Sequence, residues 1–286
     1  MLRTVSRLLP HNTRKRIYKI GTSRLLRPHY FGSALIGRTL KPSFLIIGAQ
    51  KAGTTSLFRY LLQHPDVKAP TRKQVHFFDL NFSHGERWYF SHFPPKLNSQ
   101  TKITGEASTE YLFHPEVAQR AKAILPNIQI IVLLRDPVER AYSHFHHMKR
   151  AGRELLSFEN AIERELEIFS QRGGFDFTRE DVSDIYNQSY LARGFYATQL
   201  ERWFVHFPRE QFLILQSEQF FQKVDTIFAD VVQHLGLSND YRVQNKMKHN
   251  SGVYTPMKPS TRKKLELIFE THNQYLSDLI GVDYGW

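Results

Sequence analysis

A short apolar run that ends at a glycine-containing loop restricts the fold of this chain more than any other feature. Residues 43–47 read SFLII, and the loop GAQKAGTTS follows at residues 48–56. Such a run is typical of a strand that is buried on both faces of a parallel sheet. No helix breaker follows until Pro65, so we expect a helix over residues 55–64. A strand, a glycine loop and a helix in this order predict an α/β fold.

The same alternation continues along the chain. Residues 128–134 form a second apolar run, IQIIVLL, which ends at Arg135. Further helices are expected over residues 138–150, from residue 157, over residues 192–207 and over residues 225–235, with a strand over residues 212–215. We therefore predict a P-loop-like parallel sheet flanked by helices. Ligands of such sheets bind at the carboxyl ends of strands, which are here the segments after residues 47 and 134.

The loop after the first strand has the composition of an anion-binding site. Gly48 and Gly53 allow backbone N–H groups to converge, and the following helix favours negative charge at its first turn. Lys51 and the hydroxyls at positions 54–56 add further donors. The lysine precedes the second glycine, unlike the pattern GxxxxGK[ST] of nucleoside triphosphatases. We therefore predict a phosphate-binding loop of a different kind.

The segment after the second strand can bind another anion. Arg135 stands at the strand end, and Ser143 follows it on the expected helix. A guanidinium fork and a hydroxyl together suit a phosphate. A structural pair between Arg135 and Asp136 explains the same residues equally well. Together with the Lys51 loop, however, the segment indicates a ligand with two separated anionic groups.

Charge and cysteine content limit the partners and the compartment. A formal net charge of +12 indicates an acidic partner, such as nucleic acid, an anionic membrane surface or an anionic cofactor. The absence of cysteine excludes disulfides, cysteine-bound metals and thiol nucleophiles. No apolar run approaches the roughly 18 residues of a membrane-spanning helix, and we recognise no signal peptide.

We expect a basic N-terminal arm over residues 1–42, followed by one domain over residues 43–286. Arginine and lysine alternate with leucine, valine and isoleucine in the arm. One interpretation is an amphipathic segment that lies on an anionic membrane. The other is a solvated helical arm packed on the domain, which the interruption at Pro10 favours.

These motifs resemble those of sulfotransferases that use 3′-phosphoadenosine 5′-phosphosulfate (PAPS). Residues 44–56 look like the 5′-phosphosulfate loop of that family, and residues 131–143 look like its 3′-phosphate-binding segment. The resemblance continues through HFFD at residues 76–79, GFYATQLERW at 194–203 and SGVY at 251–254. It is strongest with the branch of heparan sulfate N-sulfotransferases and 3-O-sulfotransferases and its bacterial relatives, and it covers about residues 43–286.

The resemblance implies PAPS as the cofactor, no metal, and a set of contacts. The 5′-phosphosulfate would be held by Lys51, Ala52, Gly53, Thr54, Thr55 and Ser56. The 3′-phosphate would be held by Arg135 and Ser143. Ser251, Gly252 and Tyr254 would form a loop over the nucleotide. A family lysine is missing from that loop, and Lys246 and Lys248 are its candidate replacements.

The base that takes the proton of the acceptor is the least determined part of the site. The glutamate base of the family corresponds to Gln74, and a neutral amide cannot accept a proton near pH 7. Two replacements stay open: His76, with an ordinary pKa of about 6.5, and Glu106, in a segment that the family places beside the acceptor. A third alternative is that Gln74 only orients the acceptor, or that activity is lost. Lys51 would stabilise charge on the leaving oxygen.

The acceptor side is expected around the segment PTRKQVHFFD at residues 70–79, whose Val75, Phe77 and Phe78 would be the buried residues of a strand. Gln74 and His76 would contact the acceptor, with Arg72 and Lys73 at the rim. His147 shares a helix face with Ser143, and the resemblance implies that it contacts substrate. The neighbouring His144 and His146 cannot face one ion together with His147 on a helix, which argues against zinc.

We therefore predict a sulfotransferase that acts on an alcohol or amine of a carbohydrate-like or other small acceptor. The alternatives are a P-loop kinase, and a catalytically impaired protein that binds nucleotide or an anionic membrane. We expect no nucleic-acid partner, because the aromatic and basic residues do not form an RNA-binding sheet motif. The lack of cysteine and of a membrane anchor departs from the animal Golgi members of the family. This departure favours a cytoplasmic protein of bacterial origin. In such a protein the N-terminal arm would contact the inner face of the membrane.

Overall fold

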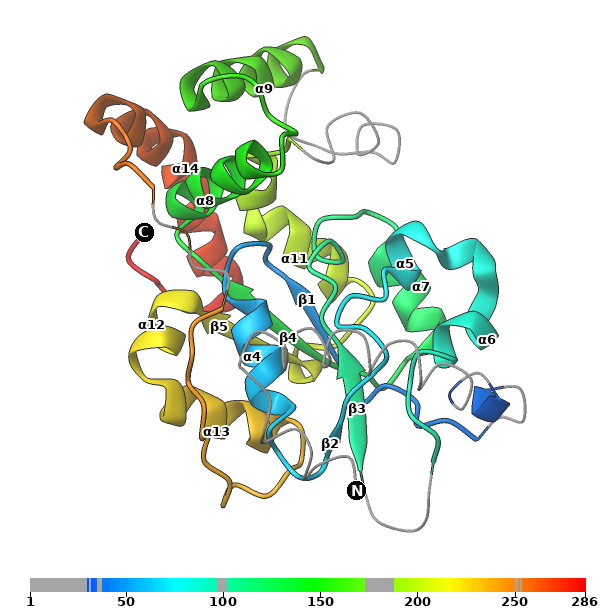
Figure 1. The fold of residues 1–286 in the computed structure, drawn as a ribbon. Helices are drawn as coiled ribbons and strands as arrows, with labels where there is room; N and C mark the ends of the chain where they lie inside the picture. The colour runs from blue at the N-terminus through cyan, green and yellow to red at the C-terminus, as the bar shows by residue number, and fades with distance from the viewer. Residues whose placement is uncertain are drawn as a thin grey trace.

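A five-stranded parallel sheet organises the chain. The computed structural model describes residues 30, 32–34, 38–96, 102–172, 188–249, 252 and 254–286. The strands follow the order β2-β3-β1-β4-β5, and each adjacent pair is parallel. Their bounds are β1 (Phe44–Gly48), β2 (Val67–Lys68), β3 (Ile103–Glu106), β4 (Gln129–Leu134) and β5 (Phe212–Gln216). The sheet is flanked by helices (Figure 1), so the predicted fold class is confirmed.

The two central strands, β1 and β4, carry the hydrophobic core. Every residue of β1 is buried, and in β4 every residue except Gln129 is buried. Phe44 pairs with Gln129 and Ile46 with Ile131 in the register of the two strands. Because both faces of these strands are covered, both faces need apolar side chains. This is why the two strands were visible in the sequence as continuous apolar runs.

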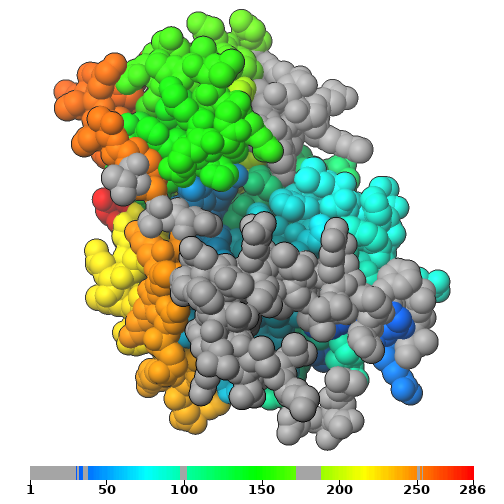
Figure 2. All heavy atoms as spheres, viewed as in Figure 1, coloured from blue at the N-terminus to red at the C-terminus, as the bar shows by residue number. Residues whose placement is uncertain are grey.

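Helices surround the sheet and extend beyond its carboxyl edge. In the first half of the chain they are α4 (Thr54–Leu61), α5 (Phe77–Leu80), η2 (Phe82–His84), α6 (Gly85–Phe90) and α7 (Val117–Ile124). In the second half they are α8 (Pro137–Arg150), α9 (Phe158–Arg172), η3 (Ala192–Gly194), α11 (Tyr196–Phe204), η4 (Arg209–Gln211), α12 (Ser217–Gln222), α13 (Val224–His234) and α14 (Pro259–Ile280). Figure 2 shows α8 and α9 (green) as one mass, with α5 and α6 (cyan) as another to their right.

Helix α8 starts directly after β4 because the sequence supplies a strong start signal. One carboxylate oxygen of Asp136, Oδ1, accepts hydrogen bonds from the backbone N–H groups of Val138 (2.8 Å) and Glu139 (3.3 Å). Pro137 occupies the first helical position, where its missing N–H group leaves no bond unmade. Arg135 is thereby fixed between a buried strand and a capped helix.

A second cluster of buried apolar side chains supports α8 from outside the sheet. Val138 and Phe145 of α8 belong to this cluster, together with Phe158 of α9 and Leu265 and Phe269 of α14. Within the same helical region, the buried Glu165 carboxylate accepts the backbone N–H groups of residues 190–192 at 2.7–3.0 Å. The cluster holds α8 firmly against the rest of the domain.

Two expectations from the sequence were wrong in detail, and one helix was missed. Phe77 and Phe78 lie in the short helix α5 rather than in a strand, because the Tyr111 hydroxyl accepts the N–H group of Phe77 (2.9 Å) in place of a neighbouring strand. Helix α11 begins only at Tyr196, after the 3-10 turn η3. The long helix α14 was not predicted, since it buries only Leu265, Phe269 and Leu276 and its apolar periodicity is weak.

Several predictions fall on residues that the structure does not describe. Most of the basic arm over residues 1–42 and Ser251 lie outside the described residues. Contact of the arm with a membrane therefore stays a prediction. Within the described ranges, no helix has both the length and the apolar character that are needed to cross a bilayer.

The close packing of β1 on β3 gives a test of this fold. Gly105 lies opposite Phe44, and a Cβ atom at Gly105 would stand 2.4 Å from the carbonyl oxygen of Phe44. We expect Gly105→Ala to lower the free energy of unfolding by about 3 kcal/mol, since backbone must move to admit the methyl group. Urea unfolding measures the change. At Gly32 a Cβ atom would meet nothing within 4 Å, so Gly32→Ala should leave the midpoint unchanged. Equal midpoints for both variants would contradict the packing.

Candidate active site

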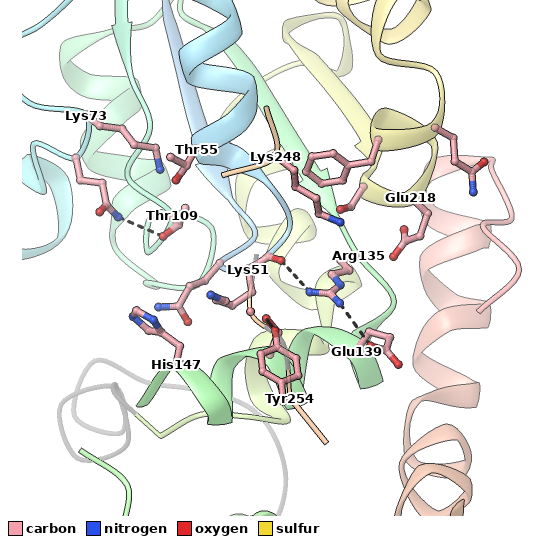
Figure 3. Close-up of a pocket in the computed structure, with 17 residues that line it drawn as sticks. Lys51, Thr55, Lys73, Thr109, Arg135, Glu139, His147, Glu218, Lys248 and Tyr254 are labelled. Atoms are coloured by element: carbon pink, nitrogen blue, oxygen red, sulfur yellow. Dashed lines mark hydrogen bonds and ion pairs between the residues drawn. The ribbon is translucent and has the colours of Figure 1, made fainter. Parts of the chain in front are cut away.

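A cavity of about 600 Å³ lies where the topology of the sheet switches direction. The central strand β1 has β3 on one side and β4 on the other, so the connections that leave β1 and β4 diverge. Lys51 and Thr55 from the loop after β1, and Arg135 from the end of β4, line the cavity (Figure 3). The structure thus brings together the two motifs that the sequence singled out.

The loop after β1 is held in an unusual backbone conformation. Lys51 has φ 75° and Gly53 has φ 100°, a region that side chains other than glycine rarely adopt. At Gly53 a Cβ atom would stand 2.8 Å from the Phe221 ring, so only glycine fits. A lysine in this region stores strain of about 1 kcal/mol or more, which is characteristic of functional loops.

The predicted loop residues divide into two groups. Lys51 and Thr55 line the cavity. The side chains of Ala52, Thr54 and Ser56 are buried instead. The Thr54 hydroxyl accepts a hydrogen bond from the Lys73 ammonium (3.3 Å), and the Ser56 hydroxyl accepts the backbone N–H group of His249 (2.9 Å). These two hydroxyls therefore join the loop to neighbouring segments.

Arg135 connects the two motifs. Its guanidinium donates to the backbone carbonyl of Lys51 (3.3 Å) and pairs with Glu139 (3.4 Å), while the Tyr196 hydroxyl donates to the Arg135 carbonyl (2.8 Å). On the same side of the cavity, the Glu218 carboxylate accepts the N–H group of Asp136 (3.2 Å). Glu139 and Glu218, the two carboxylates that line the cavity among the described residues, thus lie at the end of the cavity that contains Arg135.

A wall over this end is built from α8 and the segment that contains Tyr254. The hydroxyls of Ser143 and Tyr254 are hydrogen-bonded (2.9 Å), and the Tyr254 ring stacks on His146 at 4.3 Å between ring centroids. A Cβ atom at Gly252 would stand 2.3 Å from the Tyr254 ring. Gly252, Tyr254 and Ser143 all line the cavity, as does Lys248, whose ammonium lies 4.3 Å from the Phe221 ring centroid.

The opposite end of the cavity contains Lys73, Gln74, Thr109 and His147. The Gln74 amide donates to the Thr109 hydroxyl (3.4 Å). Figure 3 shows Lys73, Thr109 and His147 on one side of Lys51, with Lys248, Arg135, Glu139 and Glu218 on the other. We call the first side the Lys73 end and the second the Arg135 end.

Burial and neighbouring positive charges lower the pKa values of the basic side chains in the cavity. Burial, followed by the charges of Arg150, Arg135 and Arg140, lowers the pKa of Lys51 to about 8. Burial and then the charge of Arg59 lower the pKa of Lys73 to about 8 as well. Burial, followed by the charges of Lys51 and Arg150, lowers the pKa of His147 from its usual value. His147 is therefore a neutral imidazole near pH 7, beside a lysine that is still mostly protonated.

Glu106 lies behind the Lys73 end and organises it. Its carboxylate is fully buried and accepts hydrogen bonds from the Val75 N–H group (2.9 Å), the Ser108 hydroxyl (2.6 Å) and the Tyr111 hydroxyl (2.9 Å). Burial raises the pKa of Glu106, and these donors oppose the rise. Glu106 does not line the cavity. These contacts favour a positioning role for Glu106 over the role of base.

His76 also lies off the cavity. Its Nδ1 atom is 2.8 Å from a carboxylate oxygen of Asp79, a side chain with no solvent exposure. Burial alone would lower the pKa of His76, but the hydrogen bond and charge of Asp79 outweigh burial and raise it. His76 is not among the residues that line the cavity, whereas His147 is.

The three histidines of α8 occupy three different environments. His144 is fully buried against the Tyr190 ring, His146 stacks on Tyr254, and His147 lines the cavity. In the part of the chain that the structure describes, no group of three or more His, Cys, Asp or Glu side chains is arranged to hold a metal ion.

Some residues of the cavity were missed by reasoning from the sequence. They are Gln50, Thr109, Glu139, Ser217, Glu218, Phe221 and Gln222. Ser217–Gln222 form α12, directly after β5. The strand at residues 212–215 was expected, so the rule that ligands bind at carboxyl ends of strands could have identified this segment.

The fold and the cavity define an α/β protein with a cavity lined by several cationic side chains at the switch point of a parallel sheet. Residues 41–275 match the sulfotransferase domain family. A crystal structure of a sulfotransferase from Alicyclobacillus acidocaldarius aligns with a TM-score of 0.70 and 32% identity, and the alignment covers 85% of this chain and 97% of that one. The chain belongs to the sulfotransferase domain family.

Two relatives from other organisms match most of this chain. The human bifunctional heparan sulfate N-deacetylase/N-sulfotransferase 3 is 29% identical over 84% of this chain. The membrane-associated sulfotransferase kil1 of Dictyostelium discoideum is 26% identical over 86% of this chain. The matches span 30% of the length of the human protein and 66% of the length of the Dictyostelium protein.

The role of Glu106 can be tested by an isosteric change. In Glu106→Gln, an amide N–H₂ group would face donors that now bind a carboxylate, so we expect the free energy of unfolding to fall by about 1–3 kcal/mol. Activity should fall with it, since the segment at residues 73–76 loses its support. Urea unfolding and turnover are measured on the same samples, with the exposed Glu86→Gln as control. Lost activity at an unchanged midpoint would instead favour Glu106 as the base.

Proposed function

We propose that this sulfotransferase takes its sulfuryl group from PAPS and transfers it to a hydroxyl or amine of a carbohydrate-like or other small acceptor. One observation carries the proposal: a single cavity holds the Lys51 loop and the Arg135 segment, connected by the hydrogen bond from Arg135 to the Lys51 carbonyl. A ligand with two separated anionic groups matches this arrangement.

The residues of the cavity fit such a nucleotide. Lys51 and Thr55 would hold the 5′-phosphosulfate, helped by the backbone N–H groups at the start of α4. Arg135 and Ser143 would hold the 3′-phosphate, beneath the wall that Gly252 and Tyr254 form. Lys248 lines the cavity and supplies the positive charge for which two lysines were candidates. Lys246 instead forms an ion pair with Asp225.

When bound, PAPS supplies an activated sulfuryl group on the bridging oxygen of its 5′-phosphate. The Lys51 ammonium, still mostly protonated near pH 7, stabilises the negative charge that develops on that oxygen. Gln74 and Thr109 orient the acceptor from the Lys73 end. The acceptor atom then bonds to sulfur, the bond from sulfur to the bridging oxygen breaks, and the proton of the acceptor passes to a base.

We assign the base to His147 in place of His76. His147 lines the cavity at the Lys73 end. Its lowered pKa leaves the imidazole neutral near pH 7, so that one ring nitrogen can accept a proton. His76 is off the cavity and bound to Asp79. In this proposal His76 keeps the αL turn at φ 54° that places Gln74, while His147 moves the proton.

The remaining expectations stay proposals. A catalytically impaired protein is the alternative if Gln74 prevents turnover, and a P-loop kinase would require binding of ATP with magnesium. The cytoplasmic location, the bacterial origin and the contact of residues 1–42 with the inner membrane face rest on composition alone. Absence of a nucleic-acid partner rests on the sequence pattern as well.

Heat protection tests the nucleotide site. Adenosine 3′,5′-bisphosphate at about 100 times its Kd should stabilise the chain by about 2.7 kcal/mol, and ATP with magnesium should not. Lys51→Met should weaken binding by about tenfold or more, because a charge-assisted contact is lost. Thermal unfolding and calorimetry measure both effects. Lys263→Met, which removes an exposed lysine of α14, should bind normally. Unchanged affinity and turnover in Lys51→Met would refute the loop assignment.

The assignment of the base has a signature in the pH profile. In the wild type kcat/KM should rise with pH through the lowered pKa of His147, below about 6.5. It should fall above about pH 8, as Lys51 and Lys73 lose their protons. In His147→Ala the rise at low pH should vanish and kcat should drop by about 100-fold or more.

His76→Ala provides the comparison for this test. It should retain kcat within about tenfold and keep the rise at low pH, since an indirect effect on position costs less than loss of the base. The KM for PAPS should stay within about twofold in both variants. The opposite pattern, with His76→Ala inactive and His147→Ala active, would return the role of base to His76.

A further inference from the structure

The Lys73 end of the cavity offers no carboxylate that could bind a cation, among the side chains that the structure places. Its lining side chains are Lys73, Gln74, Thr109 and His147, with Lys51 between the two ends. The two carboxylates that line the cavity lie at the Arg135 end, and one of them, Glu139, is paired with Arg135 and Arg262. An acceptor at the Lys73 end therefore meets amide, hydroxyl, imidazole and ammonium groups.

Carboxylates behind this end are already engaged. Glu110 pairs with the buried Arg193 and accepts a hydrogen bond from the Gln50 amide (3.1 Å). Glu106 accepts its three hydrogen bonds in a fully buried position. Asp79 is bound to His76. None of these three lines the cavity, so none can approach an ammonium group on the acceptor.

Cations at this end, by contrast, form no ion pair with a carboxylate among the described residues, and the buried Glu106 and Glu110 act on Lys73 only at longer range. Neither Lys51 nor Lys73 forms an ion pair with a described residue, and Lys73 donates only to the neutral Thr54 hydroxyl (3.3 Å). The charges of Arg150 and Arg153 also act on His147 from the exposed end of α8. A half-buried ammonium without a carboxylate is unfavourable until an anion binds to it.

We propose that the acceptor is an alcohol that carries a negatively charged group close to the reacting hydroxyl, and that Lys73 binds that group. This inference rests on the proposed function and narrows it to O-sulfation of an acidic acceptor. The acceptor oxygen bonds to sulfur, and the bond from sulfur to the bridging oxygen breaks with its electron pair on the leaving bisphosphate. The hydroxyl proton passes to the neutral imidazole of His147, and a sulfate ester results.

An amine acceptor fits the same surroundings poorly. An amine carries a positive charge near pH 7, so the Lys51 and Lys73 ammonium groups would repel it. It would also have to lose one proton before it could attack sulfur and a second when the bond to sulfur forms, whereas the imidazole of His147 can take up only one. A hydroxyl enters uncharged, and a carboxylate or sulfate on the same molecule gains the contact with Lys73.

The test offers matched acceptors to the full chain with labelled PAPS. Each of several sugar and aliphatic scaffolds is present as a neutral alcohol, as a carboxylated alcohol and as a primary amine, and mass spectrometry locates the sulfated atom. We expect kcat/KM for the carboxylated alcohols to exceed that for the neutral alcohols by about tenfold, with the amines lowest. Preferred N-sulfation, or equal use of all three forms, would overturn the inference.

Variants assign the preference to Lys73. Lys73→Gln should reduce the advantage of the carboxylated alcohols by about tenfold through KM for the acceptor, with KM for PAPS within about twofold. Lys73→Arg should retain the preference, because it keeps the charge. Lys263→Gln removes an exposed lysine that does not line the cavity and should change nothing. An unchanged preference in Lys73→Gln would refute the role of Lys73.

The outcomes separate this inference from the proposed function. If adenosine 3′,5′-bisphosphate fails to protect the chain from heat, the proposed function itself is wrong. If the bisphosphate protects the chain but no member of the panel is labelled, the nucleotide site stands and the acceptor inference falls. Labelling of the acidic alcohols in wild type, lost selectively in Lys73→Gln, supports both.

Discussion

Burial of both faces of β1 and β4 is the constraint on which the rest of this structure depends. These strands have no room for polar side chains, so charged groups can gather only where the strands end. The loop with Lys51 begins at the end of one strand, and Arg135 stands at the end of the other. The hydrogen bond from Arg135 to the Lys51 carbonyl then joins the two ends into one site. Sheet topology thus determines which distant residues meet.

The basic side chains of the cavity have lowered pKa values in the protein without a ligand. Burial, followed by repulsion from neighbouring arginines, lowers the pKa values of Lys51 and Lys73 to about 8. Anions that bind between these cations relieve the repulsion and restore the charged forms. The proposed nucleotide and the proposed acidic acceptor would therefore each raise the pKa values of these lysines. Burial, followed by the charges of Lys51 and Arg150, also lowers the pKa of His147.

Local signals in the sequence predicted the central strands, the phosphate loop and helix α8. Each of these depends on neighbours in the chain: apolar runs, glycines, and the Asp136-Pro137 start signal. The sequence placed both His76 and His147 on the acceptor side, and only the fold shows that His147 lines the cavity while His76 is bound to Asp79. Glu106 was ambiguous for a similar reason, since its three donors come from separate turns of the fold. Helix α14 gave only weak periodicity.

Helix α8 fixes the distance between the proposed 3′-phosphate site and the proposed base. Arg135 precedes its first turn, Ser143 lies within the helix, and His147 follows Ser143 by four residues, or roughly 6 Å along the axis. From Pro137 to His147 the helix rises by about 15 Å, which places the proposed base well beyond the proposed 3′-phosphate site at Arg135. The cap at Asp136 holds one end of the helix, and the cluster with Phe158 and Phe269 holds its outer face. A base on a capped and packed helix keeps its distance from a bound nucleotide without any contribution from the acceptor loops, so those loops are free to differ in the acceptor they recognise.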